Sequence, residues 1–165
     1  MIVGIVILDQ LTKWIVVENI PLHGHVPFLE GFVRFTYTQN EGAAFGMLSD
    51  QRWVFLVLST VGIIGMCFVL YKYGKESVLM RVSISFIVGG GIGNMIDRLF
   101  RVGETGKCFV VDFIDFQFMD FAVFNVADSF ITIGAVLFVL YVIKDELIAA
   151  MKKKGETDES ITSDN

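Results

Sequence analysis

The sequence predicts a mainly α-helical integral membrane protein with four transmembrane helices and a small external β-sheet. Of its 165 residues, 54% are apolar and only 19% are charged, whereas a soluble domain has roughly 25% charged residues. A chain this short has too much surface to hide so much apolar area in a soluble core. A composition this apolar also excludes general disorder, so we expect the chain to fold in a bilayer.

Four stretches approach the length of about 20 mainly apolar residues that a membrane-spanning helix needs. The first is short and includes Asp9, Gln10 and Lys13, whereas the second has no charged residue. The fourth has one charged residue, Asp128. The four stretches lie at about residues 1–17, 53–71, 82–96 (beginning as early as 78) and 124–143.

The first stretch lacks both the basic start and the small-residue cleavage site of a secretory signal. We therefore interpret it as a retained span, and its missing basic flank leaves room for a few native residues before Met1. The segment 32–38 shows a different pattern, because Val33, Phe35 and Tyr37 alternate with polar residues. This period of two predicts a half-buried strand, which we assign to a small sheet on the outer membrane surface.

Basic residues indicate the orientation, because lysine and arginine are enriched in cytoplasmic loops. Seven lie between the second and third spans or after the fourth, and five lie on the other side. We therefore place both termini in the cytoplasm. The expected organisation is one membrane domain at 1–151, with external segments at about 18–52 and 97–123, and a polar, disordered cytoplasmic tail at 152–165. The two sets are Lys72, Lys75, Arg81, Lys144, Lys152, Lys153 and Lys154 against Arg34, Arg52, Arg98, Arg101 and Lys107.

Composition also limits which classes of ligand and which covalent cross-links the protein is expected to have. The net charge of −5 and the pI of about 4.9 argue against nucleic acid, which attracts proteins with a basic face. Cys67 lies in an apolar run and Cys108 in a loop, which gives a structural disulfide no support. His23 and His25 are too few for a metal site, which needs three or four ligands, so we interpret them as solvated loop residues and expect no metal site.

The polar residues at membrane depth carry the functional information, because such residues are costly and usually functional. Asp128 lies about four residues inside the fourth span, roughly 6 Å below its outer end at 1.5 Å per residue. Two carboxylates that share one proton can activate water and protonate a carbonyl, as in aspartic proteases. The residues alone do not select the pair, since six acids lie on the outer side: Asp9, Asp97, Asp112, Asp115, Asp120 and Asp128.

Several alternatives stay open at this point. Asp9 and Lys13, four residues apart on one helix face, form either a structural ion pair or a contact with substrate. Arg98 either snorkels to the interface or anchors a carboxylate or a lipid phosphate. The glycine run 89–93 favours close helix packing over phosphate binding, which would need a preceding strand. We interpret Asp115 as a solvated neighbour of the site.

Other classes of protein fit the sequence less well. A transporter or assembly subunit whose acids relay protons would need carboxylates across the bilayer, yet the second span has none. Another type of intramembrane aspartyl protease would have a Gly-Asp pair within a span, and no such dipeptide occurs. A nucleophilic Ser129 would need an activating base, and neither histidine lies in a span.

Five motifs together resemble the lipoprotein signal peptidase family, the bacterial signal peptidases II. They occur in the order of that family, and the resemblance covers about residues 5–144. The motifs are Asp9-Gln10-Leu11-Thr12-Lys13, Asn40-Glu41-Gly42-Ala43-Ala44-Phe45-Gly46, the run 89–98 ending in Asn94-Met95-Ile96-Asp97-Arg98, Val110-Val111-Asp112-Phe113-Ile114, and Phe124-Asn125-Val126-Ala127-Asp128-Ser129.

The resemblance implies an endopeptidase that cleaves prolipoproteins before a diacylglyceryl-modified cysteine, using two aspartates and no cofactor. It implies a β-cradle around Asn40, a short external helix or loop before the fourth span, and a site near the outer surface of the bacterial cytoplasmic membrane. It further implies contact with membrane lipid and inhibition by globomycin, and we expect a monomer. By this resemblance the catalytic pair is Asp112 and Asp128, and the supporting residues are Asp9, Lys13, Asn40, Gly42, Asn94, Arg98 and Asn125.

Overall fold

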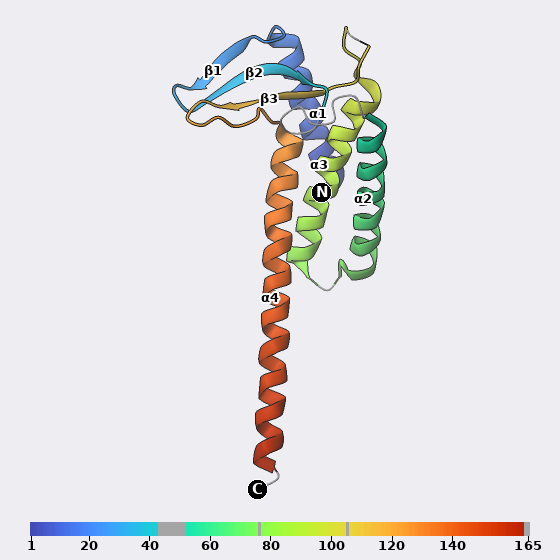
Figure 1. The fold of residues 1–165 in the computed structure, drawn as a ribbon, viewed down its shortest axis with the longest axis vertical. Coiled ribbons are helices and arrows are strands. Elements are labelled where there is room, and N and C mark those ends of the chain that lie inside the picture. The colour runs from blue at the N-terminus through green and yellow to red at the C-terminus, as the bar shows by residue number, and fades with distance from the viewer. Residues whose placement is uncertain (43–51, 76, 105, 164–165) are drawn as a thin grey trace.

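The computed structural model describes residues 1–42, 52–75, 77–104 and 106–163. Residues 43–46 of the second motif lie outside the described residues. Four helices form a bundle, and a three-stranded sheet lies across one end of it (Figure 1). The elements are α1 (Ile2–Asn19), β1 (His25–Leu29), β2 (Val33–Asn40), α2 (Arg52–Tyr73), α3 (Val78–Phe100), β3 (Val110–Phe116) and α4 (Val126–Ser163).

Helix α3 occupies the centre of the bundle and packs against each of the other three helices. Its glycines allow this, because a side chain at Gly89 would lie 2.9 Å from Ile5 of α1. A side chain at Gly90 would collide with the backbone carbonyl of Ala127 on α4. The glycine run therefore serves helix packing, as the sequence favoured.

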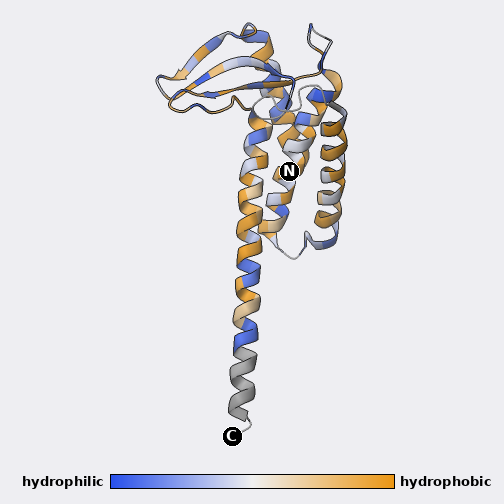
Figure 2. Ribbon diagram, viewed as in Figure 1, coloured by the Kyte–Doolittle hydropathy of each residue, from blue (hydrophilic) through white to orange (hydrophobic). Residues whose placement is uncertain are grey.

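Three helices are long and apolar enough to cross a membrane, counted among the described residues: α2, α3 and α4. The expected fourth span, α1, is not among them, since it carries Asp9, Lys13 and Glu18 within 18 residues. Asp9 and Lys13 are fully buried inside the bundle. Most of the exposed side chains of α2, and of α4 up to residue 143, are apolar (Figure 2), as expected for surfaces that face lipid.

The sheet is antiparallel, in the order β1-β2-β3. Strand β2 confirms the strand predicted at 32–38. The sheet rests on the end of α1 through a core that includes Val16, Tyr37 and Phe113. Residues 117–120 between β3 and α4 form turns, so the connection expected as a short helix or loop is a loop.

Helix α4 continues well past the other helices, on the side away from the sheet (Figure 1). It enters the segment 152–165, for which the sequence predicts disorder. Side chains here, such as those of Lys144 and Lys152, are exposed. Lys, Glu, Ala and Met have high helix propensity, which accounts for a helical backbone without burial. The division into a domain and a disordered tail stays a prediction. The turn between α2 and α3 also lies away from the sheet (Figure 1), so the seven basic residues expected in the cytoplasm belong to segments on that side.

Candidate active site

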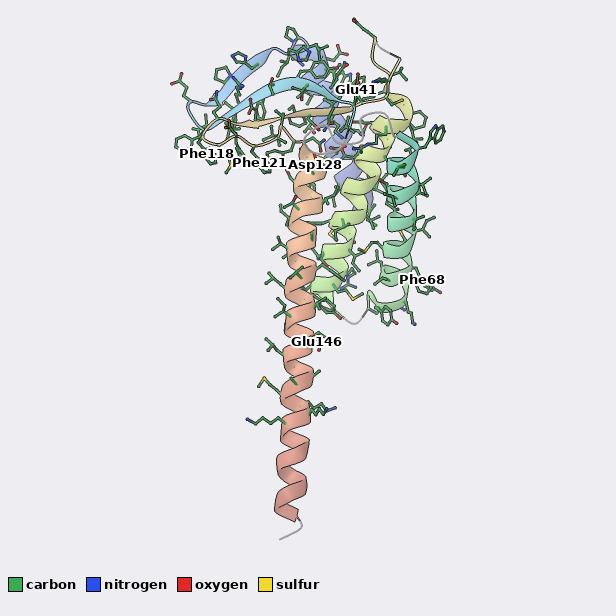
Figure 3. All side chains as sticks on the ribbon, in the orientation of Figure 1. Glu41, Phe68, Phe118, Phe121, Asp128 and Glu146 are labelled. Atoms are coloured by element: carbon green, nitrogen blue, oxygen red, sulfur yellow. The ribbon has the colours of Figure 1, made fainter. Side chains whose placement is uncertain are left out.

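A cavity of about 650 Å³ lies where the sheet meets the first turn of α4. Its polar lining includes Asn40, Asn94 and Arg98 together with two carboxylates, Asp112 and Asp128. Asp112 projects from the middle of β3, and Asp128 lies at the start of α4, beneath the sheet (Figure 3). Two acids from separate parts of the chain thus face one space.

Asp112 is almost fully buried and is held by two amides. Asn40 Nδ2 donates to Oδ2 at 2.9 Å, and Asn125 Nδ2 donates to Oδ1 at 2.6 Å. The pKa of Asp112 is raised from 3.8 to about 6, chiefly by burial and in part by the nearby charge of Asp128, while the two amide hydrogen bonds act to lower it. Near neutral pH this carboxyl therefore exchanges readily between its protonated and charged forms.

Asp128 lies in the first turn of α4, and a reciprocal pair of hydrogen bonds holds it there. Asn125 Oδ1 accepts from the Asp128 N–H at 3.0 Å, and the Asn125 N–H donates to Asp128 Oδ2 at 3.2 Å. This arrangement has the geometry of a capping box. The amide of Asn94 donates to the other oxygen, Oδ1, at 2.7 Å. A helix N-terminus stabilises negative charge, so the location suits a carboxylate.

Asn125 links the two acids. Its buried amide donates to Asp112, to Asn94 Oδ1 at 3.1 Å and to the Val111 carbonyl at 3.3 Å, while its backbone binds Asp128. Asn40 is oriented in a similar way, since Gly42 N–H donates to its Oδ1 at 3.0 Å and so directs its Nδ2 at Asp112. The structure thereby gives both asparagines a geometric role beside the carboxylates.

Behind the cavity lies a second, fully buried cluster centred on Lys13. Its ammonium contacts Asp9 at 3.0 Å, Asp97 at 2.9 Å and Asn94 Oδ1 at 2.9 Å. Asp9 also accepts from the Ala127 N–H at 3.0 Å, next to Asp128. Of the two open interpretations, the geometry favours a structural ion pair, because neither Asp9 nor Lys13 lines the cavity.

Asp97 is the residue that the sequence-based site left out. One oxygen accepts from the Val111 N–H at 3.2 Å, and the other accepts from Gln10 at 3.0 Å and Arg101 at 3.1 Å. It therefore fixes the backbone next to Asp112. The sequence contained one signal, an acid four residues before Arg101 at the end of a span, but it could not show that β3 lies against it.

The remaining acids, Asp115 and Asp120, and Arg98 each have different surroundings. Asp115 is not a solvated neighbour, as the sequence suggested, because it is buried in an ion pair with Arg34 of β2. Asp120 is exposed in the turn after β3. Arg98 lines the cavity within electrostatic reach of Asp128 and Asp112, and it donates to the Asn94 carbonyl at 3.3 Å. This position fits an anchoring arginine better than a snorkelling one.

The described residues hold no group of three or more His, Cys, Asp or Glu able to bind a metal ion. Residues 1–144 match the protein family described as signal peptidase (SPase) II. The chain belongs to the signal peptidase II family. This confirms the resemblance drawn from the five motifs, and it makes the chain a peptidase rather than a proton-relaying transporter or assembly subunit.

Individual signal peptidases II agree with this assignment over most of their length. The chain is 40% identical over 140 residues to a lipoprotein signal peptidase of Streptococcus pneumoniae, covering 85% of this chain and 88% of that one. It is 42% identical over 142 residues to one of Streptococcus pyogenes serotype M2, covering 86% and 90%.

Two solved structures share the fold. Both are described as bacterial membrane enzymes, and each is 35% identical to this chain. One aligns with a TM-score of 0.80, covering 88% of this chain and 86% of the solved one, and the other with 0.77, covering 87% and 90%. The fold described above is therefore that of a membrane-embedded enzyme.

Proposed function

We propose that this signal peptidase II is an aspartic endopeptidase that removes the signal peptide from prolipoproteins, cutting before the diacylglyceryl-modified cysteine. The observation that carries the proposal is the pair Asp112 and Asp128, the acids that line the cavity within the described chain. The curated relatives are named lipoprotein signal peptidases, which supports the substrate class.

The two aspartates divide the chemistry. Asp128, at the helix N-terminus, acts as the base that takes a proton from water, and Asp112, with its raised pKa, donates a proton to the scissile carbonyl oxygen. The hydroxyl adds to the carbonyl carbon and forms a neutral tetrahedral diol. On collapse, the cysteine nitrogen takes the proton from Asp128, the C–N bond breaks, and the diol proton returns to Asp112.

The surrounding residues hold these groups in place. Asn40, Asn94 and Asn125 orient the carboxylate oxygens through the contacts described above. Arg98 is placed to anchor a backbone carbonyl or a lipid phosphate at the cavity mouth. Lys13, with Asp9, supports Asn94 from behind. Preorganised hydrogen bonds of this kind contribute to catalysis because they need no rearrangement during the reaction.

The proposed setting is the bacterial cytoplasmic membrane. The sheet and the cavity lie at the outer surface, both termini lie in the cytoplasm, and α1 serves as the fourth span because Asp9 and Lys13 are buried in the bundle rather than exposed to lipid. The cavity also has an apolar wall that includes Phe116, Phe124 and Ile133. This wall suits a substrate whose signal helix and lipid remain in the membrane. The enzyme acts as a monomer, since one chain supplies both aspartates.

A cleavage assay with the purified protein tests the proposal. A lipidated precursor peptide should be cut, and the same peptide without lipid should be cut far more slowly. Asp112→Asn and Asp128→Asn should each abolish turnover, and the double variant should be no worse than either, because members of a catalytic unit are strongly non-additive. Asp120→Asn, an exposed acid after β3, is the matched control and should stay active. Turnover by a folded single variant would overturn the assignment.

Inhibitors test the mechanism separately. Globomycin should block cleavage, as should a substrate analogue that places a hydroxyl between the two aspartates, because transition-state mimics bind far more tightly than substrates. EDTA should leave the rate unchanged, since the proposed steps use carboxylates alone. Loss of activity with EDTA that a divalent metal restores would contradict the mechanism.

A further inference from the structure

The sheet carries a cluster of exposed apolar side chains at the end farthest from α1. Phe28 is 69% exposed and Phe118 is 58% exposed. Both lie outside the helix bundle. We name this cluster the aromatic tip; it consists of Phe28, Leu29, Phe32, Phe118, Met119 and Phe121, all of which are exposed.

Two separate turns build the aromatic tip. The Gln117 N–H donates to the Phe32 carbonyl at 2.9 Å, which joins the turn between β1 and β2 to the turn after β3. The rings of Phe32 and Phe118 lie 6.0 Å apart, and those of Phe116 and Phe118 lie 5.5 Å apart. The tip is thus a connected, ordered surface rather than a set of single exposed residues. In water such a contiguous apolar patch is unfavourable.

The position of the tip indicates what covers it. Phe118 and Phe121 lie along the margin of the sheet that faces the length of α4, nearly level with Asp128 at the start of that helix (Figure 3). Below Asp128, the exposed side of α4 is apolar and includes Ile133, Val136 and Leu140. A bilayer that covers this side of α4 has its outer boundary near the level of the tip, so the two apolar surfaces are continuous.

We propose that the aromatic tip inserts into the outer leaflet of the bilayer and fixes the depth of the sheet. Apolar and aromatic faces of membrane-surface elements typically enter the boundary between headgroups and acyl chains by about 5–10 Å. A sheet held at that depth sets the height of Asp112, which projects from β3. The aromatic tip contacts the lipid bilayer itself, and this contact does not require a bound substrate.

A spin-label depth measurement tests this. In a Cys67→Ala, Cys108→Ala background, a nitroxide is attached at Phe118→Cys, and the full chain is placed in vesicles of phosphatidylethanolamine and phosphatidylglycerol without substrate. A label in the leaflet is more accessible to oxygen, which concentrates in lipid, than to a water-soluble nickel chelate. We expect oxygen to dominate at position 118. The matched control is Glu104→Cys, an exposed site in the other outer turn, where we expect nickel to dominate.

Nickel dominance at position 118 in vesicles would overturn the proposal. A label at 118 that stays in water until a lipidated precursor peptide is added would also overturn it, because the surface would then bind substrate instead of lipid. Phe28→Cys provides a second, independent site in case the first variant fails to fold, and it should behave as position 118 does. Since the vesicles contain no substrate, the result does not depend on the proposed peptidase function.

Discussion

The stability of the Asp112→Asn variant, compared with that of the wild type, should increase from acid to alkaline pH, even though the variant is inactive. The pKa of Asp112 is raised from 3.8 to about 6 because the side chain is 3% exposed and close to Asp128. The folded state therefore prefers the protonated carboxyl. Its contribution to stability is fully present below pH 3.8 and is lost as pH rises through about 6. The shift of about 2 pKa units corresponds to about 3 kcal/mol at 1.36 kcal/mol per unit.

Asparagine removes this pH dependence but also loses a hydrogen bond. Asn40 and Asn125 both donate to Asp112, and an amide at position 112 can accept only one of these bonds well. The unpaired donor costs about 1–3 kcal/mol at every pH. The variant should thus be about 1–3 kcal/mol less stable than the wild type at pH 4 and equal to it or up to about 2 kcal/mol more stable at pH 8.

The quantity to measure is the difference between these two effects, which does not depend on the lost hydrogen bond. Thermal unfolding of both proteins in detergent micelles at pH 4 and pH 8 should show the Tm of the variant rising, relative to wild type, by about 6–12 °C between the two pH values. Asp120→Asn makes the same change of charge at an exposed site and should show no such rise. An equal Tm difference at both pH values would refute the burial argument for Asp112.

Three further predictions concern packing, charge and orientation. Lys13→Met leaves two buried carboxylates without their ammonium partner and should lower the free energy of unfolding by about 3–5 kcal/mol, measured by denaturant titration; a loss below 1 kcal/mol would contradict the role of the ion pair. Gly93→Ala would place a methyl group 2.5 Å from an Asp9 oxygen and should reduce both Tm and cleavage, whereas Gly4→Ala, with no heavy atom within 4 Å, should leave both unchanged. A cysteine at the exposed position Glu104 should react with an impermeant reagent added to intact cells, and one at the exposed position Lys75 only in inverted membrane vesicles; the reverse pattern would exclude processing of exported prolipoproteins.

Much of the fold follows from local properties of the sequence. Uninterrupted apolar runs marked α2 and α4, because a side chain that faces lipid must be apolar whatever its neighbours in the sequence are. The alternation around Phe35 marked β2 for a similar reason, since one face of a strand on a core is buried and the other is not. The composition excluded a soluble protein, and the motifs placed Asp112 and Asp128 among a small set of acids that the family resemblance then narrowed.

The pairing of charges was decided by tertiary structure alone. Asp9 and Asp97 share Lys13, Asp115 joins Arg34, and Asp112 faces the cavity with Asp128. These partners come from different elements, and their proximity depends on how α3 packs against α1 and α4 and on the register of β2 with β3.

The same physical reason explains why the sequence misjudged Asp115 and gave Asp97, one of its six candidate acids, no supporting role. The electrostatic cost of a carboxylate is set by its burial and by the cation or amide that folding brings to it. Asp120, only five residues from Asp115, remains exposed to solvent. Residue type and spacing thus indicate a membrane protein with an acidic site, and packing alone determines which of its acids are buried in ion pairs and which two share a cavity.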